Sequence, residues 1–218
     1  SPDSLSGQII LEKWQFIVTS FINGDFQSAE RQLLASNIPY SIVEFYDIDT
    51  ARTYYMLREN LNLNYYDDNN TPDYPNDDES GSFDYGWGLF LMNQNSMNPL
   101  IVHSVHPCDD FITLPICVKA FQDWDARYLM FSSSGRGVLG FNNDTSLSDP
   151  SRNSDHPFNS FYKQACLEIR SFAERELVFQ LHSFDRRTIN FPACLISANY
   201  HGDNTSDLPI RDHSSNML

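Results

Sequence analysis

Side chains that bind metal ions gather directly after one short apolar run. The run spans residues 100–105, and His106, Asp109 and Asp110 follow it. An imidazole and a carboxylate three residues apart can bind one Zn²⁺ ion, as in catalytic sites built from two histidines and a carboxylate. His106 and Asp109 are therefore predicted metal ligands, and Asp110 stays open as the alternative carboxylate.

A second segment has the same form and offers the third ligand. Residues 177–181 are mostly apolar, and His182 follows them. Open α/β sheets place their sites at the carboxyl ends of their strands. We therefore predict that His182 joins His106 at one metal ion. His103 lies on the opposite face of its strand from His106, so it could join only if a bulge intervened.

Such a centre suggests hydrolysis. Zinc with three protein ligands keeps a position for water, lowers the pKa of that water to about 7, and polarises a carbonyl group. Arg136, in a glycine-rich turn, and Arg152, in a long polar loop, are predicted to hold a substrate carboxylate through paired N–H donors. Asp185 and Asp149 are the candidate catalytic carboxylates, and Asp212 is a further alternative for the general base.

Strands and helices must position these side chains, and hydrophobic periodicity predicts where they lie. Helices are expected over residues 8–22 and 25–35, joined by a tight turn into a helical hairpin. Residues 64–82 are acidic and are predicted to form a solvated loop. The remaining elements are expected at residues 40–46 (strand), 53–57 (strand or short helix), 86–92 (strand), 100–105 (strand), 113–121 (helix), 126–131 (strand), 159–174 (helix), 177–181 (strand) and 193–198 (strand).

The order of these elements predicts the fold. The strand at 100–105, the helix at 113–121 and the strand at 126–131 have the spacing of a βαβ unit, whose strands are parallel. We expect an α/β fold, namely a three-layer α/β/α sandwich with a mostly parallel or mixed central sheet and a small N-terminal helical hairpin. The hairpin would occupy residues 1–38, and a zinc-hydrolase-like α/β domain residues 39–218.

Composition excludes several classes of partner. The 218 residues are 41% hydrophobic and carry a net charge of −15, which fits a globular protein and argues against nucleic acid and anionic membranes. No apolar run approaches the roughly 20 residues that span a bilayer, so membrane insertion is not expected. Acidity, few lysines and many Tyr and Asn residues favour a secreted or periplasmic protein whose signal peptide is not in this chain.

The same motifs resemble a known family. Residues 106–110, 134–136, 148–150 with 159–161, and 180–184 occur in the order seen in bacterial proteins similar to the zinc carboxypeptidase and N-formylglutamate amidohydrolase group. The resemblance covers roughly residues 85–200. It implies a zinc-dependent exopeptidase fold and a metal-dependent amidohydrolase or peptidase that acts on a peptide or acyl-amino-acid substrate. Asp109 stands where carboxypeptidases have Glu, and His182 stands for their distant His.

Two other readings stay open. Residues 106–110 also resemble the His-Pro-Asp-Asp motif of zinc-dependent N-acetylglucosamine deacetylases of the LmbE-like group, although Cys108 occupies the position of the catalytic Asp. The third reading is a non-catalytic binding domain on the same fold, because no Glu late in the chain matches the general base of carboxypeptidases.

Overall fold

The computed structural model describes residues 5–67, 79–107, 109–110, 112–135 and 148–182. Six of the described strands form one mixed sheet, in the order β1-β2-β5-β7-β6-β8. Neighbours from β1 to β7 pair antiparallel, whereas β6 pairs parallel with both β7 and β8. The predicted parallel pair of the βαβ unit is confirmed. The strands are β1 (Tyr40–Asp47), β2 (Arg52–Glu59), β5 (Leu89–Met92), β6 (Leu100–Ser104), β7 (Tyr128–Phe131) and β8 (Leu177–Gln180).

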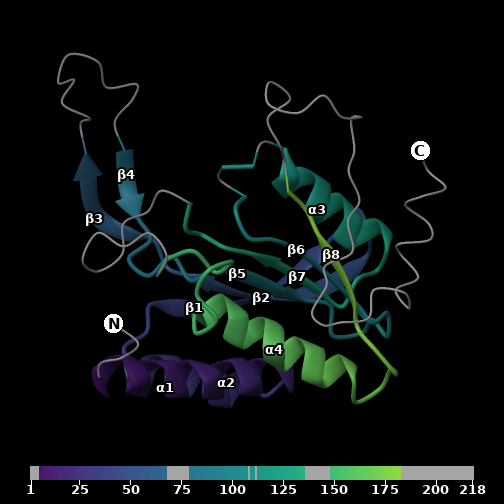
Figure 1. Ribbon diagram of the computed structural model, residues 1–218, viewed down its shortest axis with the longest axis horizontal. Coiled ribbons are helices and arrows are strands. Elements are labelled where there is room, and N and C mark those ends of the chain that lie inside the picture. The colour runs from purple at the N-terminus through teal and green to yellow at the C-terminus, as the bar shows by residue number, and fades with distance from the viewer. Residues whose placement is uncertain (1–4, 68–78, 108, 111, 136–147, 183–218) are drawn as a thin grey trace. The chain divides into compact units, whose positions relative to one another are not determined.

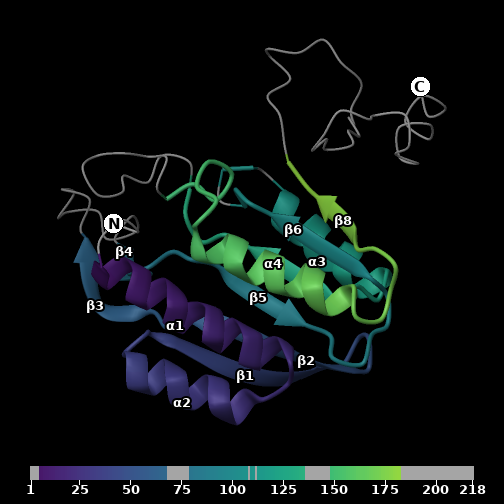
Figure 2. The same ribbon diagram turned by 60° about the horizontal axis from the view of Figure 1, so that its bottom comes forward.

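Helices cover both faces of this sheet. Helices α1 (Leu5–Ile22), α2 (Phe26–Ser36) and α4 (Pro157–Ile169) lie on one face, and α3 (Thr113–Asp123) lies on the other (Figure 1). In Figure 2, α1 runs between α2 and α4. The protein is therefore the α/β/α sandwich that the sequence predicts, with the N-terminal helical hairpin in one outer layer.

The turn of the hairpin follows from two residues. Gly24 has a φ of +75°, a conformation that glycine adopts without steric cost. Asp25 then caps the start of α2, because its carboxylate accepts a hydrogen bond from the backbone N–H of Ser28 at 3.1 Å. The hairpin packs on the sheet, and Trp14 of α1 stacks edge-on against Tyr40 and Trp87. Residues on both sides of the boundary expected near residue 38 thus share one core.

Strand β6 shows how the two layers of core are built. Ile101 belongs to the core beneath α1 and α4, and Val102 belongs to the core beneath α3. Both side chains are fully buried. A strand with helices on both faces needs apolar side chains in both directions, which explains its continuous apolar run. This burial fixes the direction in which the end of β6 points.

Three expectations about the elements need comment. Residues 64–82 were predicted to be a loop, but β3 (Asn62–Asp67) pairs antiparallel with β4 (Glu79–Ser82), so the prediction was wrong at both ends. Leu63 and Tyr65 alternate with asparagines there, and this short strand pattern outweighs the acidic composition. Residues 53–57, left undecided, lie in β2. The strand expected at 193–198 lies outside the described residues.

We predict that Phe161 is a main support of the core beneath α4. Its side chain is fully buried and stacks on Phe90 with the ring centroids 4.4 Å apart. Phe161→Ala should lower the free energy of unfolding by about 3–5 kcal/mol, measured by urea denaturation. Phe16→Ala, at a half-exposed position of α1, is the matched control and should change it by no more than about 0.5 kcal/mol. Equal losses in the two variants would contradict the assignment.

Candidate metal centre

Two parallel strands bring the predicted histidines together. β6 and β8 are neighbours in the sheet, with His103 opposite Gln180, and the backbone N–H of Leu181 still donates to the His103 carbonyl at 2.9 Å. His106 and His182 follow the two strands at the same edge of the sheet. Their ring centroids lie 5.8 Å apart.

The carboxylate that joins these rings comes from Asp110. After β6 the chain turns back, and the N–H of Asp110 donates to the carbonyl of His106 at 2.8 Å. Residues four apart in such a turn are neighbours in space. Asp110 Oδ2 accepts a hydrogen bond from Nδ1 of His182 at 3.0 Å. One ligand atom from each of His106, Asp110 and His182 lies within 4.8 Å of the other two.

Asp109, the preferred ligand from sequence, does not belong to this group. Its carboxylate lies beside the turn after β7, where a Cβ added to Gly135 would come within 3.3 Å of its Oδ2. Spacing in the sequence favours the carboxylate three residues after His106, but the turn presents the one four residues after it. The alternative that the sequence left open, Asp110, is the carboxylate that the structure brings to the two histidines.

His106 is held from its other side by Asp149. The Nε2 atom of His106 lies 2.9 Å from Asp149 Oδ1, and both side chains are almost completely buried. Burial by itself would raise the pKa of Asp149, but hydrogen bonds from Ser151 and from His106 outweigh it, and the pKa is lowered below its ordinary value. Asp149 is thus an anion at neutral pH. An ionised carboxylate only accepts hydrogen bonds, so Nε2 of His106 is the nitrogen that carries the proton.

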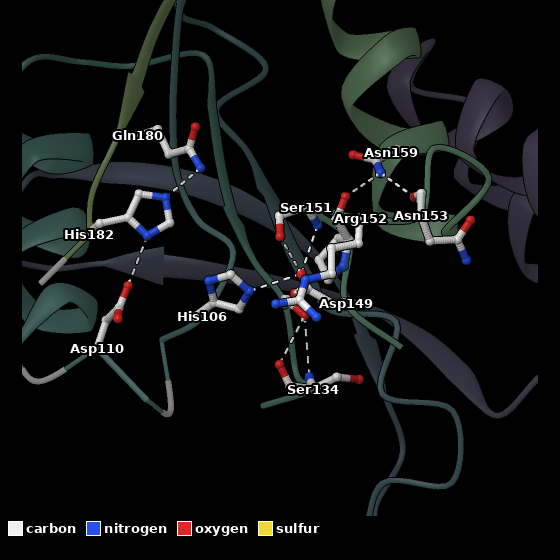
Figure 3. A network of polar contacts seen from close by, with 12 residues as sticks. His106, Asp110, Ser134, Asp149, Ser151, Arg152, Asn153, Asn159, Gln180 and His182 are labelled. Carbon is white, nitrogen blue, oxygen red and sulfur yellow. Dashed lines mark hydrogen bonds and ion pairs between the residues drawn. The ribbon is translucent and has the colours of Figure 1, made fainter. Parts of the chain in front are cut away.

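The opposite nitrogen of this ring is bare. Within the described part of the chain, Nδ1 of His106 is buried and has no hydrogen-bond partner. In Figure 3 it points away from Asp149 and toward the side where Asp110 and His182 lie. A buried acceptor without a partner costs about 1–3 kcal/mol, so such atoms call for an explanation. A cation bound by Nδ1 provides one, and two imidazoles with a carboxylate are a donor set that suits Zn²⁺.

The start of α4 fixes Asp149 in place. Ser151 donates to Asp149 Oδ1 through its N–H at 2.8 Å and through its hydroxyl at 2.6 Å. Asn159, in the first turn of α4, donates to the carbonyls of Pro150 and Asn153, each at 2.8 Å. Both oxygens of Asp149 are engaged, because Oδ2 lies 3.4 Å from Nε of Arg152. Asp149 therefore contacts His106 directly, and the catalytic role expected for it from the sequence stays a prediction.

The other predicted residues are placed as follows. Arg152 is 63% exposed and lies next to Asp149, at the border of the site (Figure 3). His182 is held by Gln180, whose side-chain Nε2 lies 2.7 Å from Nε2 of the ring. The sequence reasoning missed Gln180, although its position two residues before His182 puts both side chains on one face of an extended chain. Arg136 and Asp185 lie outside the described residues.

His103 faces away from the site. Its ring packs near Phe158 and Tyr162 of α4, with centroid distances of 6.1 and 5.8 Å. Burial, and to a smaller extent the nearby His182, lower the pKa of His103 to about 4. The strand is regular at this point, so no bulge turns His103 toward the ligands.

No protein-family model, no curated protein and no solved structure matches this chain. The resemblance noted in the sequence therefore stays a prediction. In the described part of the chain, none of the helices combines the length and the apolar character needed to cross a bilayer.

We predict that His103 makes stability sensitive to acid. Its pKa is about 4 in the folded protein and near 6.5 in the unfolded chain, so the unfolded chain binds more protons between these values. Stability should be unaffected by His103 above pH 6.5 and should fall by up to about 3 kcal/mol as the pH drops to 4. In urea denaturation, the free energy of unfolding of His103→Phe should rise relative to that of the wild-type protein as the pH falls through this range. Parallel pH profiles for the two proteins would refute the prediction.

Proposed function

We propose that this protein is a zinc-dependent hydrolase that cleaves an amide bond in a peptide or acyl-amino-acid substrate. The observation that carries the proposal is the bare, buried Nδ1 of His106, which faces Asp110 and His182 while Asp149 holds Nε2. A histidine that binds zinc characteristically donates its other N–H to a carboxylate. An Asp–His pair that served packing alone would gain nothing from leaving the second nitrogen buried and bare.

His106, Asp110 and His182 would hold the ion in this proposal. Zinc bound by three protein ligands activates a water molecule at neutral pH and polarises the carbonyl group that is to be cleaved. Asp149 keeps the His106 ring oriented and supplies negative charge behind it. The general base stays unassigned, since both oxygens of Asp149 are engaged and Asp185 lies outside the described residues.

Arg152 supports a substrate that carries a carboxylate. Its guanidinium is largely exposed, and Asp149 is the charged partner that the structure gives it in the described part of the chain. A guanidinium can bind a carboxylate through two parallel N–H donors. A free carboxylate close to the scissile amide is a feature of both peptides and acyl-amino acids, so this arginine would select among amides.

The metal assignment predicts which variants lose zinc. Protein purified without chelator should contain about one zinc per chain by elemental analysis. His106→Ala, Asp110→Asn and His182→Ala should lose it, because each removes one of three ligands. Asp109→Asn should keep it, and so should Asp123→Asn, a control at an exposed position of α3. Loss in the Asp109 variant with retention in the Asp110 variant would restore the ligand set first expected from the sequence.

The substrate assignment predicts a change of selectivity at Arg152. Zinc-loaded protein should hydrolyse N-acyl-amino acids or peptides with a free carboxylate faster than their carboxamides. Arg152→Ala should raise KM for the free acids by roughly 10–100-fold, the value of a charged hydrogen-bonded pair, and should keep its zinc. Arg152→Lys should lie between the two. Zinc binding without turnover of any amide would favour the non-catalytic binding domain, and turnover of acetylated amino sugars would favour the deacetylase.

A further inference from the structure

Gln180 and Asp149 occupy equivalent places at the two histidines. The side-chain amide of Gln180 lies 2.7 Å from Nε2 of His182, just as the carboxylate of Asp149 lies 2.9 Å from Nε2 of His106. Each contact leaves the Nδ1 atom of its ring on the side where the other ligands lie (Figure 3). Nδ1 of His182 is the nitrogen that meets Asp110, at 3.0 Å. The two rings are thus presented in the same way by different partners.

The two rings differ in how strongly packing restrains them. The side chain of His106 is 5% exposed, whereas that of His182 is 41% exposed. Neighbouring atoms on all sides restrain a buried ring, but an exposed ring samples several rotamers unless hydrogen bonds select one. Within the described residues, His182 has two such bonds, to Asp110 and to Gln180. Asp110 is itself a proposed ligand and would contact the ion. Of the two partners, Gln180 is therefore the one that would contact only the His182 ring.

We propose that Gln180 is a positioning residue for the metal centre, which holds His182 at Nε2 so that Nδ1 binds the ion. The inference rests on the proposed function, because it requires that His182 is a ligand. It gives Gln180, which lies in the 180–184 segment of the resemblance, a role that was not predicted from the sequence. Gln180 is the last residue of β8, so the pairing of β8 with β6 fixes its backbone.

The amide suits this role because it can serve both forms of the ring. In the structure the Gln180 amide donates to Nε2, and Nδ1–H of His182 donates to Asp110. A ring that binds a metal through Nδ1 carries its proton on Nε2 instead, and its partner must then accept. The amide of glutamine has a donor NH₂ and an acceptor oxygen on one planar group. A flip of the amide plane, which exchanges the positions of the NH₂ and the oxygen, therefore keeps the contact when the ion is bound.

The test compares the Zn²⁺ affinity of three proteins, measured by competition with a chromophoric chelator. Gln180→Leu keeps the size of the side chain but can neither donate nor accept, and it should weaken binding by about 10–100-fold. Gln180→Glu accepts from Nε2–H as Asp149 does at His106, and it should bind at least as tightly as the wild-type protein. Gln27→Leu, at an exposed position of α2, is the matched control and should bind like the wild-type protein.

Two further measurements separate the positioning of His182 from a loss of fold stability and from a change in long-range charge. Thermal unfolding without metal should be the same in Gln180→Leu and in the wild-type protein, because the contact lies at a solvent-exposed strand end. Raising the salt concentration to 1 M shortens the Debye length to about 3 Å, so affinity that Gln180→Glu retains there comes from the direct contact and not from distant charge.

The outcomes distinguish the two proposals. Wild-type affinity in Gln180→Leu, or equally weak binding in the Leu and Glu variants, would overturn the role of Gln180 while leaving the metal centre intact. Absence of Zn²⁺ binding in the wild-type protein and in Gln27→Leu alike would overturn the proposed function, and the role of Gln180 with it.

Discussion

The site depends on the parallel pairing of β6 with β8. These strands are far apart in the chain, yet their register sets His103 opposite Gln180 and so brings His106 and His182 to one edge of the sheet. The pairing is stable because β6 is buried on both faces, with Ile101 in one core layer and Val102 in the other. A slip of one residue would turn each side chain of β8 to the opposite face and would separate the two rings. Site geometry is thus a consequence of sheet register.

A second constraint acts from the helical layer. The first turn of α4 binds the segment around Asp149 through the amide of Asn159, and Asp149 binds His106. One histidine is therefore held by a buried carboxylate close to the start of α4, while the other is held by Asp110 and by Gln180 of β8. His106 is thus almost completely buried, whereas solvent reaches His182.

Much of the fold could be read from the sequence, but the detail of the site could not. Periodicity predicts the helical hairpin, the βαβ unit and the two strands that end in histidine, because burial repeats along the chain. The choice between Asp109 and Asp110 depends on a single turn closed by a backbone hydrogen bond to His106, which no periodicity records. Gln180 was missed because its role appears only once His182 is known to lie beside Asp110. The β3–β4 pair was hidden by its acidic surroundings.

The position of β8 at the end of the described sheet has a thermodynamic consequence. Among the described strands, β8 pairs with β6 alone, and a strand paired on one side is a part of a sheet that opens readily. Separation of β8 from β6 would carry His182 away from His106 and Asp110. A cation bound by all three residues would therefore stabilise the pairing of β8 with β6. Ion binding and the pairing of β8 with β6 would then be linked equilibria, each favouring the other by mass action.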